Sequence, residues 1–166
     1  GNKTKLMPIK AMDASGGIVA GYEGIIYAAD HGCQIINCSW GNNTYSQFAQ
    51  DVINYAVLYR GCLVVAAAGN RGAATDDMPY TRFYPASYDN VFSVAATGPS
   101  DERWSGSSYA ITVDVSAPGQ GTYTTKQFDQ YGYTYGTSLA SPLVAGTAGL
   151  LKAYKPKLNN KQLAEQ

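Results

Sequence analysis

The sequence predicts an α/β protein in which a mostly parallel sheet lies between layers of helices. Short apolar runs alternate with longer segments whose apolar residues recur at helical spacing. The runs are apolar throughout, which is typical of parallel strands covered on both faces. Glycine-bearing segments follow several of these runs, where ligands bind in such sheets, beyond the carboxyl ends of the strands. The 166 residues suffice for about one domain.

The expected elements follow one another along the chain without an internal repeat. Strands are expected over residues 6–12, 34–40, 63–70, 90–97 and 111–119. Helices are expected over 18–32, 44–60 and 137–154, and the final "NNKQLAEQ" reads as the start of another helix. Gly32 and Gly61 end the first two helices, and the third ends before Pro156.

The composition excludes some classes of partner. The formal net charge is zero and only 14% of the residues are charged. Nucleic acids and anionic membranes require a basic excess, so neither is expected as a partner. No apolar stretch reaches the length of about 18 residues that a membrane-spanning helix needs.

The three cysteines, Cys33, Cys38 and Cys62, are interpreted as small buried thiols. A Cys33–Cys62 disulfide is the alternative, because each of these residues follows a glycine at the start of an apolar run. The chain has no Cys-x-x-Cys pair, so a zinc site is not expected.

Ser138 lies where the loop of "YGTSLASPLVAG" (residues 135–146) enters a helix. The N–H groups and dipole of a helix N-terminus suit a negatively charged oxygen, so Ser138 is a candidate nucleophile. From this segment alone an N-cap role is favoured, because caps are commoner than nucleophiles. Asn70 ends "VVAAAGN", where its amide is either a donor to such an oxygen or part of a turn.

Taken together, these segments resemble the subtilisin-like serine peptidases (subtilases). "GTSLASPLVAG" resembles their serine signature, "VVAAAGN" their oxyanion-asparagine strand, and "IINCSWG" the strand that pairs with substrate. "YPASYDNVFSVAAT" and "VDVSAPG" follow in the family's order. The resemblance runs from about Ile9 to Leu151 and implies the family's three-layer fold, with a mostly parallel sheet flanked by helices.

The resemblance implies a role for each matching residue. Ser138 would attack a peptide carbonyl, while the Asn70 amide and the Ser138 N–H would bind the oxyanion, supported by Thr137. An extended polypeptide substrate would pair with two edges and enter a pocket. The residues implied in substrate binding are Ala14, Ser15, Gly16, Ser39, Trp40, Gly41, Ala67, Ala68 and Gly69.

The resemblance also implies features beyond this site. The chemistry would need no cofactor, and no metal ligand is assigned. Structural calcium is common in the family, and Asp76 and Asp77 form the one acidic pair considered as a site for it. A pro-peptide in the parent protein and an extracellular or cell-surface location are further expectations.

Two triad members are expected outside this sequence. The family orders its triad as Asp, His and Ser, and the first two would lie upstream of Met7. We therefore expect residues 1–166 to be part of a catalytic domain truncated at the N-terminus and at the C-terminus. Without the histidine base, Ser138 would be a poor nucleophile and the fragment inactive.

Four other residues are aspartates or a histidine, but none lies at the position of the triad aspartate or histidine. Asp13 in "DASGG" is interpreted as a loop residue, and His31 as a residue at the end of a helix, far from the strand ends. Asp114 and Asp129 match no triad position.

The sequence departs from the family pattern at several positions. Leu143 stands for the usual histidine of the signature, Leu139 for methionine, and Trp40 for leucine. Tyr131, Tyr133 and Tyr135 form an aromatic strip, interpreted as a strand packing on the sheet, with a substrate-side role as the alternative.

Two other functions compete with that of an endopeptidase. One is a non-catalytic binding or structural module on a degenerate subtilase fold, which the upstream sequence would distinguish. The other is an α/β-hydrolase, suggested by the turn around Ser138. That fold needs a histidine after the nucleophile, and no histidine follows Ser138.

Overall fold

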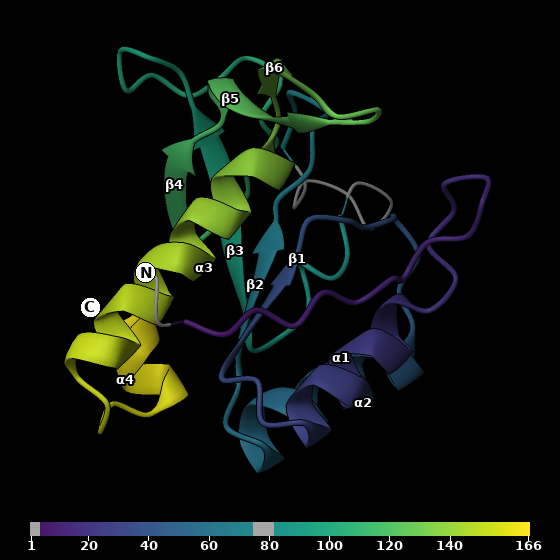
Figure 1. Cartoon of the computed structure of the whole chain (residues 1–166), viewed down its shortest axis with the longest axis vertical. Helices are drawn as coiled ribbons and strands as arrows, with labels where there is room; N and C mark the ends of the chain where they lie inside the picture. Colours follow the sequence, from purple (N-terminus) through teal and green to yellow (C-terminus); the bar gives the residue numbers. More distant parts are fainter. Residues whose placement is uncertain (1–3, 75–81) are drawn as a thin grey trace.

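A four-stranded parallel sheet forms the centre of the protein (Figure 1). The structure is a computed structural model that describes residues 4–74 and 82–166. The strands lie in the order β1 (Ile35–Cys38), β2 (Leu63–Ala67), β3 (Val91–Thr97) and β4 (Val115–Pro118). Each neighbouring pair is parallel. The carboxyl ends of all four strands therefore lie at the same edge of the sheet.

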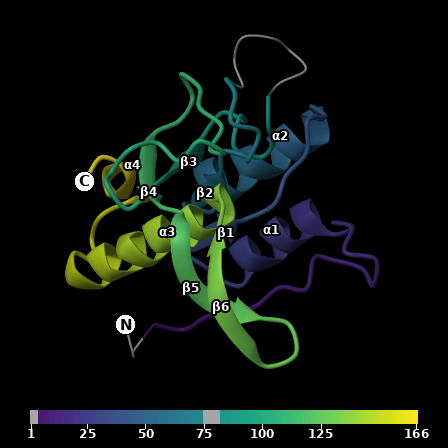
Figure 2. The same ribbon diagram turned by 90° about the horizontal axis from the view of Figure 1, so that it is seen from above.

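Helices cover both faces of this sheet, as Figure 2 shows from above. On one face α1 (Gly21–Asp30) and α2 (Gln47–Asn54) pack against Val64 and Ala66. On the other face α3 (Thr137–Tyr154) and α4 (Asn160–Ala164) pack against Leu63 and Val65. Successive side chains of β2 point to opposite faces of the sheet, and all of them are buried. The sheet therefore has one hydrophobic core on each face. The predicted three-layer α/β architecture is confirmed.

The helix boundaries differ by a few residues from those predicted. α1 begins at Gly21, and α2 begins after Ser46, whose side chain accepts a hydrogen bond from the Ala49 N–H. α2 continues as a π-helical turn, η1 (Tyr55–Tyr59), and the chain then bends at Gly61, which has a φ of 71°. α4 carries a capping box at Asn159, which confirms the helix expected at the end of the sequence.

The prediction of a strand over residues 6–12 was wrong. The described part of this segment contains a single bridge, between Met12 and Ile18, and no strand. Ile9 lies against Gly24 of α1, while Leu6 is 88% exposed. A strand requires a hydrogen-bonded neighbour, and the sheet formed by the described residues begins at β1.

An antiparallel hairpin formed by β5 (Gln120–Lys126) and β6 (Gln130–Tyr135) was not predicted. Its turn places Phe128 and Asp129 at φ values of 60° and 55°. Positive φ in hairpin turns is usually adopted by glycine, asparagine or aspartate, so Asp129 is typical but Phe128 is not, and the turn contains no glycine. In Figure 1 the hairpin lies beside the N-terminal end of α3.

Two glycines, Gly119 after β4 and Gly146 inside α3, are expected to respond in opposite ways to substitution by alanine, because only Gly119 is crowded. A Cβ atom at Gly119 would lie 2.5 Å from the Ala96 Cβ and 2.8 Å from the Gly136 carbonyl oxygen. We expect Gly119→Ala to lower the free energy of unfolding by about 1–3 kcal/mol. Gly146, inside α3, is different, because a Cβ atom added there would meet no atom within 4 Å.

The matched control, Gly146→Ala, is expected to raise the free energy of unfolding by about 0.5–1 kcal/mol because alanine favours helix. Urea unfolding followed by circular dichroism measures both changes. A Gly119→Ala protein as stable as the unsubstituted one would contradict the close approach.

Candidate active site

Three segments meet beyond the carboxyl ends of β1 and β2. Ser39 follows β1, Gly69 and Asn70 follow β2, and Ser138 is the second residue of α3. Direct hydrogen bonds join the third segment to each of the other two. The structure therefore brings together the glycine-bearing segments that the sequence places at the strand ends.

Thr137 connects the start of α3 to the end of β2. Its hydroxyl donates to Asn70 Oδ1 at 2.9 Å and accepts from the Gly69 N–H at 3.1 Å. Its main-chain N–H also donates to Asn70 Oδ1, at 2.8 Å. Thr137 is fully buried, so these polar groups depend on one another for their hydrogen bonds. Two of the three bonds fix the Asn70 side chain against the first turn of α3, and the third holds the Gly69 backbone there.

The orientation of the Asn70 amide follows from these partners. The Thr137 N–H can only donate, so the oxygen of the amide must face it, and Oδ1 accepts both bonds. Nδ2 is left as the donor of this side chain. Gly136 has a φ of 147° and would place a Cβ 3.3 Å from Nδ2. Glycine at this position therefore keeps the approach to the amide open.

Two hydrogen bonds between Ser138 and Ser39 join the start of α3 to the segment that follows β1. Ser138 Oγ donates to the Ser39 carbonyl at 3.2 Å, and Ser39 Oγ donates to the Ser138 carbonyl at 2.9 Å. Asn37 of β1 supports the pair, because its amide donates to Ser39 Oγ at 3.0 Å and its side-chain carbonyl accepts from Ser141 Oγ.

Asn37 and Ser141 are thus structural supports of the site that the sequence analysis missed. Both lie inside motifs quoted for the resemblance, "IINCSWG" and "GTSLASPLVAG". Ser141 lies one helical turn after Ser138 and is buried, so its hydroxyl needs a hydrogen-bond partner. That requirement could have indicated a supporting contact from a neighbouring strand.

The arrangement supplies donors for a negatively charged oxygen. α3 runs for 18 residues, and its first N–H groups lack partners within the helix. The Thr137 N–H binds Asn70, and the Leu139 N–H binds the Gly136 carbonyl at 3.0 Å. Among the described residues the Ser138 N–H has no such partner. This N–H, the Asn70 side chain and the positive end of the helix dipole lie at the start of α3, where Ser138 is the second residue.

The residues expected to bind substrate fall into two groups. In the first group, Ser39, Trp40 and Gly41 follow β1 and are half-buried. Ala67, the last residue of β2, and the following Ala68 and Gly69 are buried. Trp40 packs edge-on against Tyr22 at 5.2 Å. A Cβ on Gly41 would collide with the Tyr84 carbonyl oxygen, so the chain is tightly packed there.

Ala14, Ser15 and Gly16 lie apart from this group, in an exposed loop closed by Asp13. Asp13 Oδ1 accepts from Ser15 Oγ at 2.7 Å and from the N–H groups of Ser15 and Gly17. These hydrogen bonds, led by that of the Ser15 hydroxyl, lower the pKa of Asp13. The Asp13 carboxylate therefore serves the loop itself, and its hydrogen bonds to the described residues do not reach Ser138.

The structure places the other candidate acids and bases away from Ser138. His31 caps the end of α1, where Nδ1 contacts the Tyr27 carbonyl at 2.8 Å and the ring stacks on Tyr27. Asp114 precedes β4 and accepts from the Ser93 N–H at 2.7 Å, with a pKa raised by burial. Asp129 lies in the hairpin turn.

The aromatic strip forms an exposed face of the hairpin. Tyr131, Tyr133 and Tyr135 are 65–71% exposed. Tyr123 of β5 lies 5.1 Å from Tyr133 and 6.3 Å from Tyr131 between ring centroids, and Tyr135 lies 5.5 Å from Trp104. The strand predicted for these tyrosines is present as β6, but their rings contact Tyr123 of β5 and Trp104 rather than the strands of the parallel sheet.

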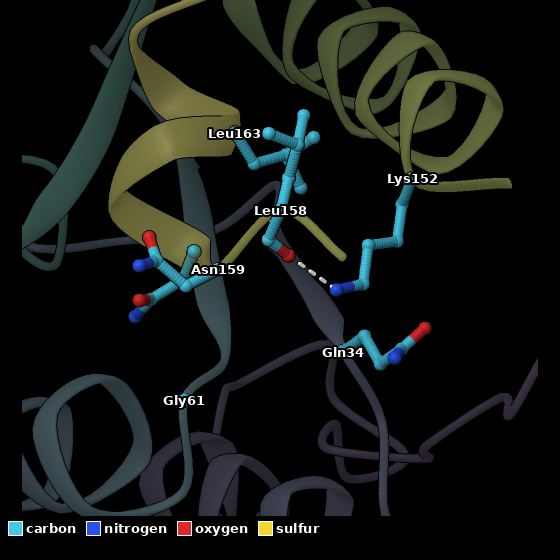
Figure 3. Close-up of a pocket in the computed structure, with 7 residues that line it drawn as sticks. Gln34, Gly61, Lys152, Leu158, Asn159 and Leu163 are labelled. Atoms are coloured by element: carbon cyan, nitrogen blue, oxygen red, sulfur yellow. Dashed lines mark hydrogen bonds between the residues drawn. The ribbon is translucent and has the colours of Figure 1, made fainter. Parts of the chain in front are cut away.

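The pocket in Figure 3 lies at the opposite, amino end of the sheet. It has a volume of about 90 Å³ and is lined by Gln34 and Gly61, which precede β1 and β2, and by residues of α3 and α4. Lys152 crosses it and donates to the Leu158 carbonyl. This small pocket has no part in the site around Ser138.

Two further expectations concern ions and membranes. Within residues 4–74 and 82–166, no group of three or more His, Cys, Asp or Glu side chains is placed to hold a metal ion. Asp76 and Asp77 lie outside the described residues. No described helix is both long and apolar enough to cross a bilayer.

Comparison with known proteins assigns the family. The sequence profile of the subtilase family matches residues 2–165, so the chain belongs to this family. It is similar to a thermophilic serine proteinase of Bacillus sp. (strain AK1), with 42% identity over 89% of this chain and 36% of that protein. It is also similar to thermitase of Thermoactinomyces vulgaris, with 39% identity over 95% of this chain and 55% of that protein.

Solved structures show the same fold. A cold-adapted subtilisin-like serine proteinase superposes with a TM-score of 0.83 at 28% identity, covering 94% of this chain and 56% of that one. A protease from Pseudoalteromonas arctica PAMC 21717 gives 0.78 at 30% identity, covering 87% and 49%. The chain spans about half the length of most of these relatives.

The bonds of Thr137 predict a specific loss of stability. Thr137→Val keeps the shape of the side chain but leaves the Gly69 N–H without its acceptor, so the free energy of unfolding should fall by about 1–3 kcal/mol. Thr147 lies exposed on the same helix with its hydroxyl on the Leu143 carbonyl, and Thr147→Val should change stability by less than about 0.5 kcal/mol. Equal effects in urea unfolding would show that the Thr137 hydroxyl does not join α3 to β2.

Proposed function

We propose that the protein carrying this chain is a serine endopeptidase that cleaves polypeptides through an acyl-enzyme at Ser138. The observation that carries the proposal is the position of Ser138 at the start of α3, beside an Asn70 amide held by Thr137. A nucleophile next to donors for the developing oxyanion is the arrangement that acyl transfer requires. Membership of the subtilase family supports the same reaction class.

In the proposed reaction, Ser138 Oγ loses its proton to a histidine base and attacks the scissile carbonyl carbon. The carbonyl oxygen becomes negative and accepts hydrogen bonds from Asn70 Nδ2 and the Ser138 N–H. Collapse of this intermediate transfers the proton to the leaving amine and leaves an ester on Ser138, which water then hydrolyses. In the proposed whole protein the base and its aspartate come from the segment before Gly1.

The substrate is proposed to bind as an extended chain along Ser39-Trp40-Gly41, with a side chain against Ala67-Ala68-Gly69. Main-chain pairing of this kind gives affinity with little demand on sequence. Ala14-Ser15-Gly16 is proposed as the opposing edge. The hydrogen bonds of Asp13 to Ser15 and Gly17 hold the shape of this exposed loop.

The proposal needs no cofactor for the chemistry. Structural calcium is proposed from the family resemblance alone; residues 4–74 and 82–166 contain no group of three or more His, Cys, Asp or Glu side chains for it, although main-chain carbonyls also bind calcium. By family resemblance, the whole protein is proposed to act outside the cell or at its surface and to carry a pro-peptide.

Covalent labelling tests the proposal and the dependence on the upstream segment. The whole protein should react with a fluorophosphonate probe at Ser138, and a Ser138→Ala variant should not. Residues 1–166 alone should remain unlabelled, because their one histidine, His31, lies at the end of α1 and is not placed to accept the proton of Ser138. A whole protein that folds but does not label would instead favour a non-catalytic module, and strong labelling of the fragment would contradict the missing base.

Substitution of Asn70 separates its two roles. Asn70→Asp keeps an oxygen for Thr137 but removes the Nδ2 donor and adds negative charge near the oxyanion. We expect kcat of the whole protein to fall by at least about 10²–10³, the loss known for removal of this donor from a subtilisin. The free energy of unfolding should change little. Peptide hydrolysis kinetics measure the effect, and an unchanged kcat would exclude Asn70 from the oxyanion site.

A further inference from the structure

Two of the three cysteines lie together at the amino end of the sheet, far from Ser138. Cys33 follows α1 and Cys62 immediately precedes β2. The Leu63 N–H donates to the Gln34 carbonyl at 2.9 Å, so each cysteine directly precedes a residue of this hydrogen-bonded pair. The start of β1 and the start of β2 therefore hold the two residues side by side.

The side chains of the two cysteines face the same core. In a regular pair of strands, Cys33 and Cys62 would point to opposite faces, because Cys62 lies opposite Gln34 in the register. Cys33 lies outside β1, however, and its N–H donates to the Ala28 carbonyl at 3.0 Å. Both side chains consequently pack into the core beneath α1 and α2.

The sulfur of Cys62 is already in contact with Cys33. Cys62 Sγ donates to the Cys33 carbonyl at 3.0 Å. Cys33 Sγ in turn lies 3.7 Å from Met7 Sδ, and its side chain is half-buried while Cys62 is 1% exposed. This contact places the Cys62 sulfur beside Cys33, and a bond between the two sulfurs requires rotation of the two side chains.

We propose that Cys33 and Cys62 form a redox-active thiol pair that closes to an intramolecular disulfide with an oxidised low-molecular-weight disulfide such as oxidised glutathione. Cys33, the accessible thiol, attacks one sulfur of glutathione disulfide, which releases one glutathione and leaves a mixed disulfide on Cys33. Cys62 then attacks Cys33 Sγ and releases the second glutathione. The two protein thiols lose two electrons and two protons, which glutathione disulfide gains.

Burial and the neighbouring Cys33 raise the pKa of Cys62, whereas Arg60 lowers it. Cys62 is therefore the poorer attacking group for an external disulfide, and it acts once Cys33 carries the leaving group. Cys38 offers a contrast within the same chain. It is 1% exposed at the other end of β1, and burial raises its pKa to about 12, so it should not react.

The disulfide would tie together the two ends of the segment 34–61. That segment contains β1, the proposed substrate strand Ser39-Trp40-Gly41 and α2. Closing a loop of this size restricts the unfolded chain, so oxidation should stabilise the fold without touching the site around Ser138.

Peptide mapping of the whole protein tests the pair. The Ser138→Ala form is used to prevent self-digestion, and it is incubated with glutathione disulfide, alkylated and digested. Tandem mass spectrometry should find the peptide that contains Cys33 joined to the peptide that contains Cys62, with the loss of two hydrogens and with Cys38 unlinked. The apparent thermal midpoint should rise by roughly 5–10 °C on oxidation.

Matched variants make the result specific. Cys38→Ser should keep both the crosslink and the thermal shift, while Cys33→Ser and Cys62→Ser should lose both. Three free thiols after oxidation, a mixed disulfide that persists on Cys33, or a crosslink through Cys38 would each overturn the proposal.

Discussion

The site depends on the hydrogen bonds that Thr137 makes between the start of α3 and the end of β2. Its hydroxyl accepts from Gly69 and donates to Asn70, and its N–H donates to the same oxygen of Asn70. Because Thr137 is fully buried, water cannot replace these partners. One residue therefore fixes both the direction of the Asn70 amide and the position of the next residue, Ser138.

The parallel sheet makes this arrangement possible. Its strands end at one edge, where β1 delivers Ser39 and β2 delivers Gly69 and Asn70. Gly69, with a φ of 104°, lets the chain turn out of β2 toward α3. The positive end of the α3 dipole lies at the same edge, because Thr137, the first residue of α3, is hydrogen-bonded to Gly69 and Asn70.

The sequence predicted the layers and the meeting of the three segments, because buried parallel strands and helices have distinct apolar periods. It predicted less well what depends on partners distant in the chain. Residues 6–12 have the composition of a strand, but among the described residues a single bridge, between Met12 and Ile18, is all the pairing this segment has. The hairpin turn uses Phe128 and Asp129 without glycine, and the support of Asn37 by Ser141 arises only once β1 and α3 are packed.

The central claim is that Ser138 and Asn70 act on one reacting carbonyl. The most direct measurement is a crystal structure of the whole protein with a peptide boronic acid, which mimics the tetrahedral intermediate. The account predicts boron bonded to Ser138 Oγ, with one boron-bound oxygen about 2.7–3.1 Å from both Asn70 Nδ2 and the Ser138 nitrogen. An adduct on another residue, or a boronate oxygen turned away from Asn70, would contradict it.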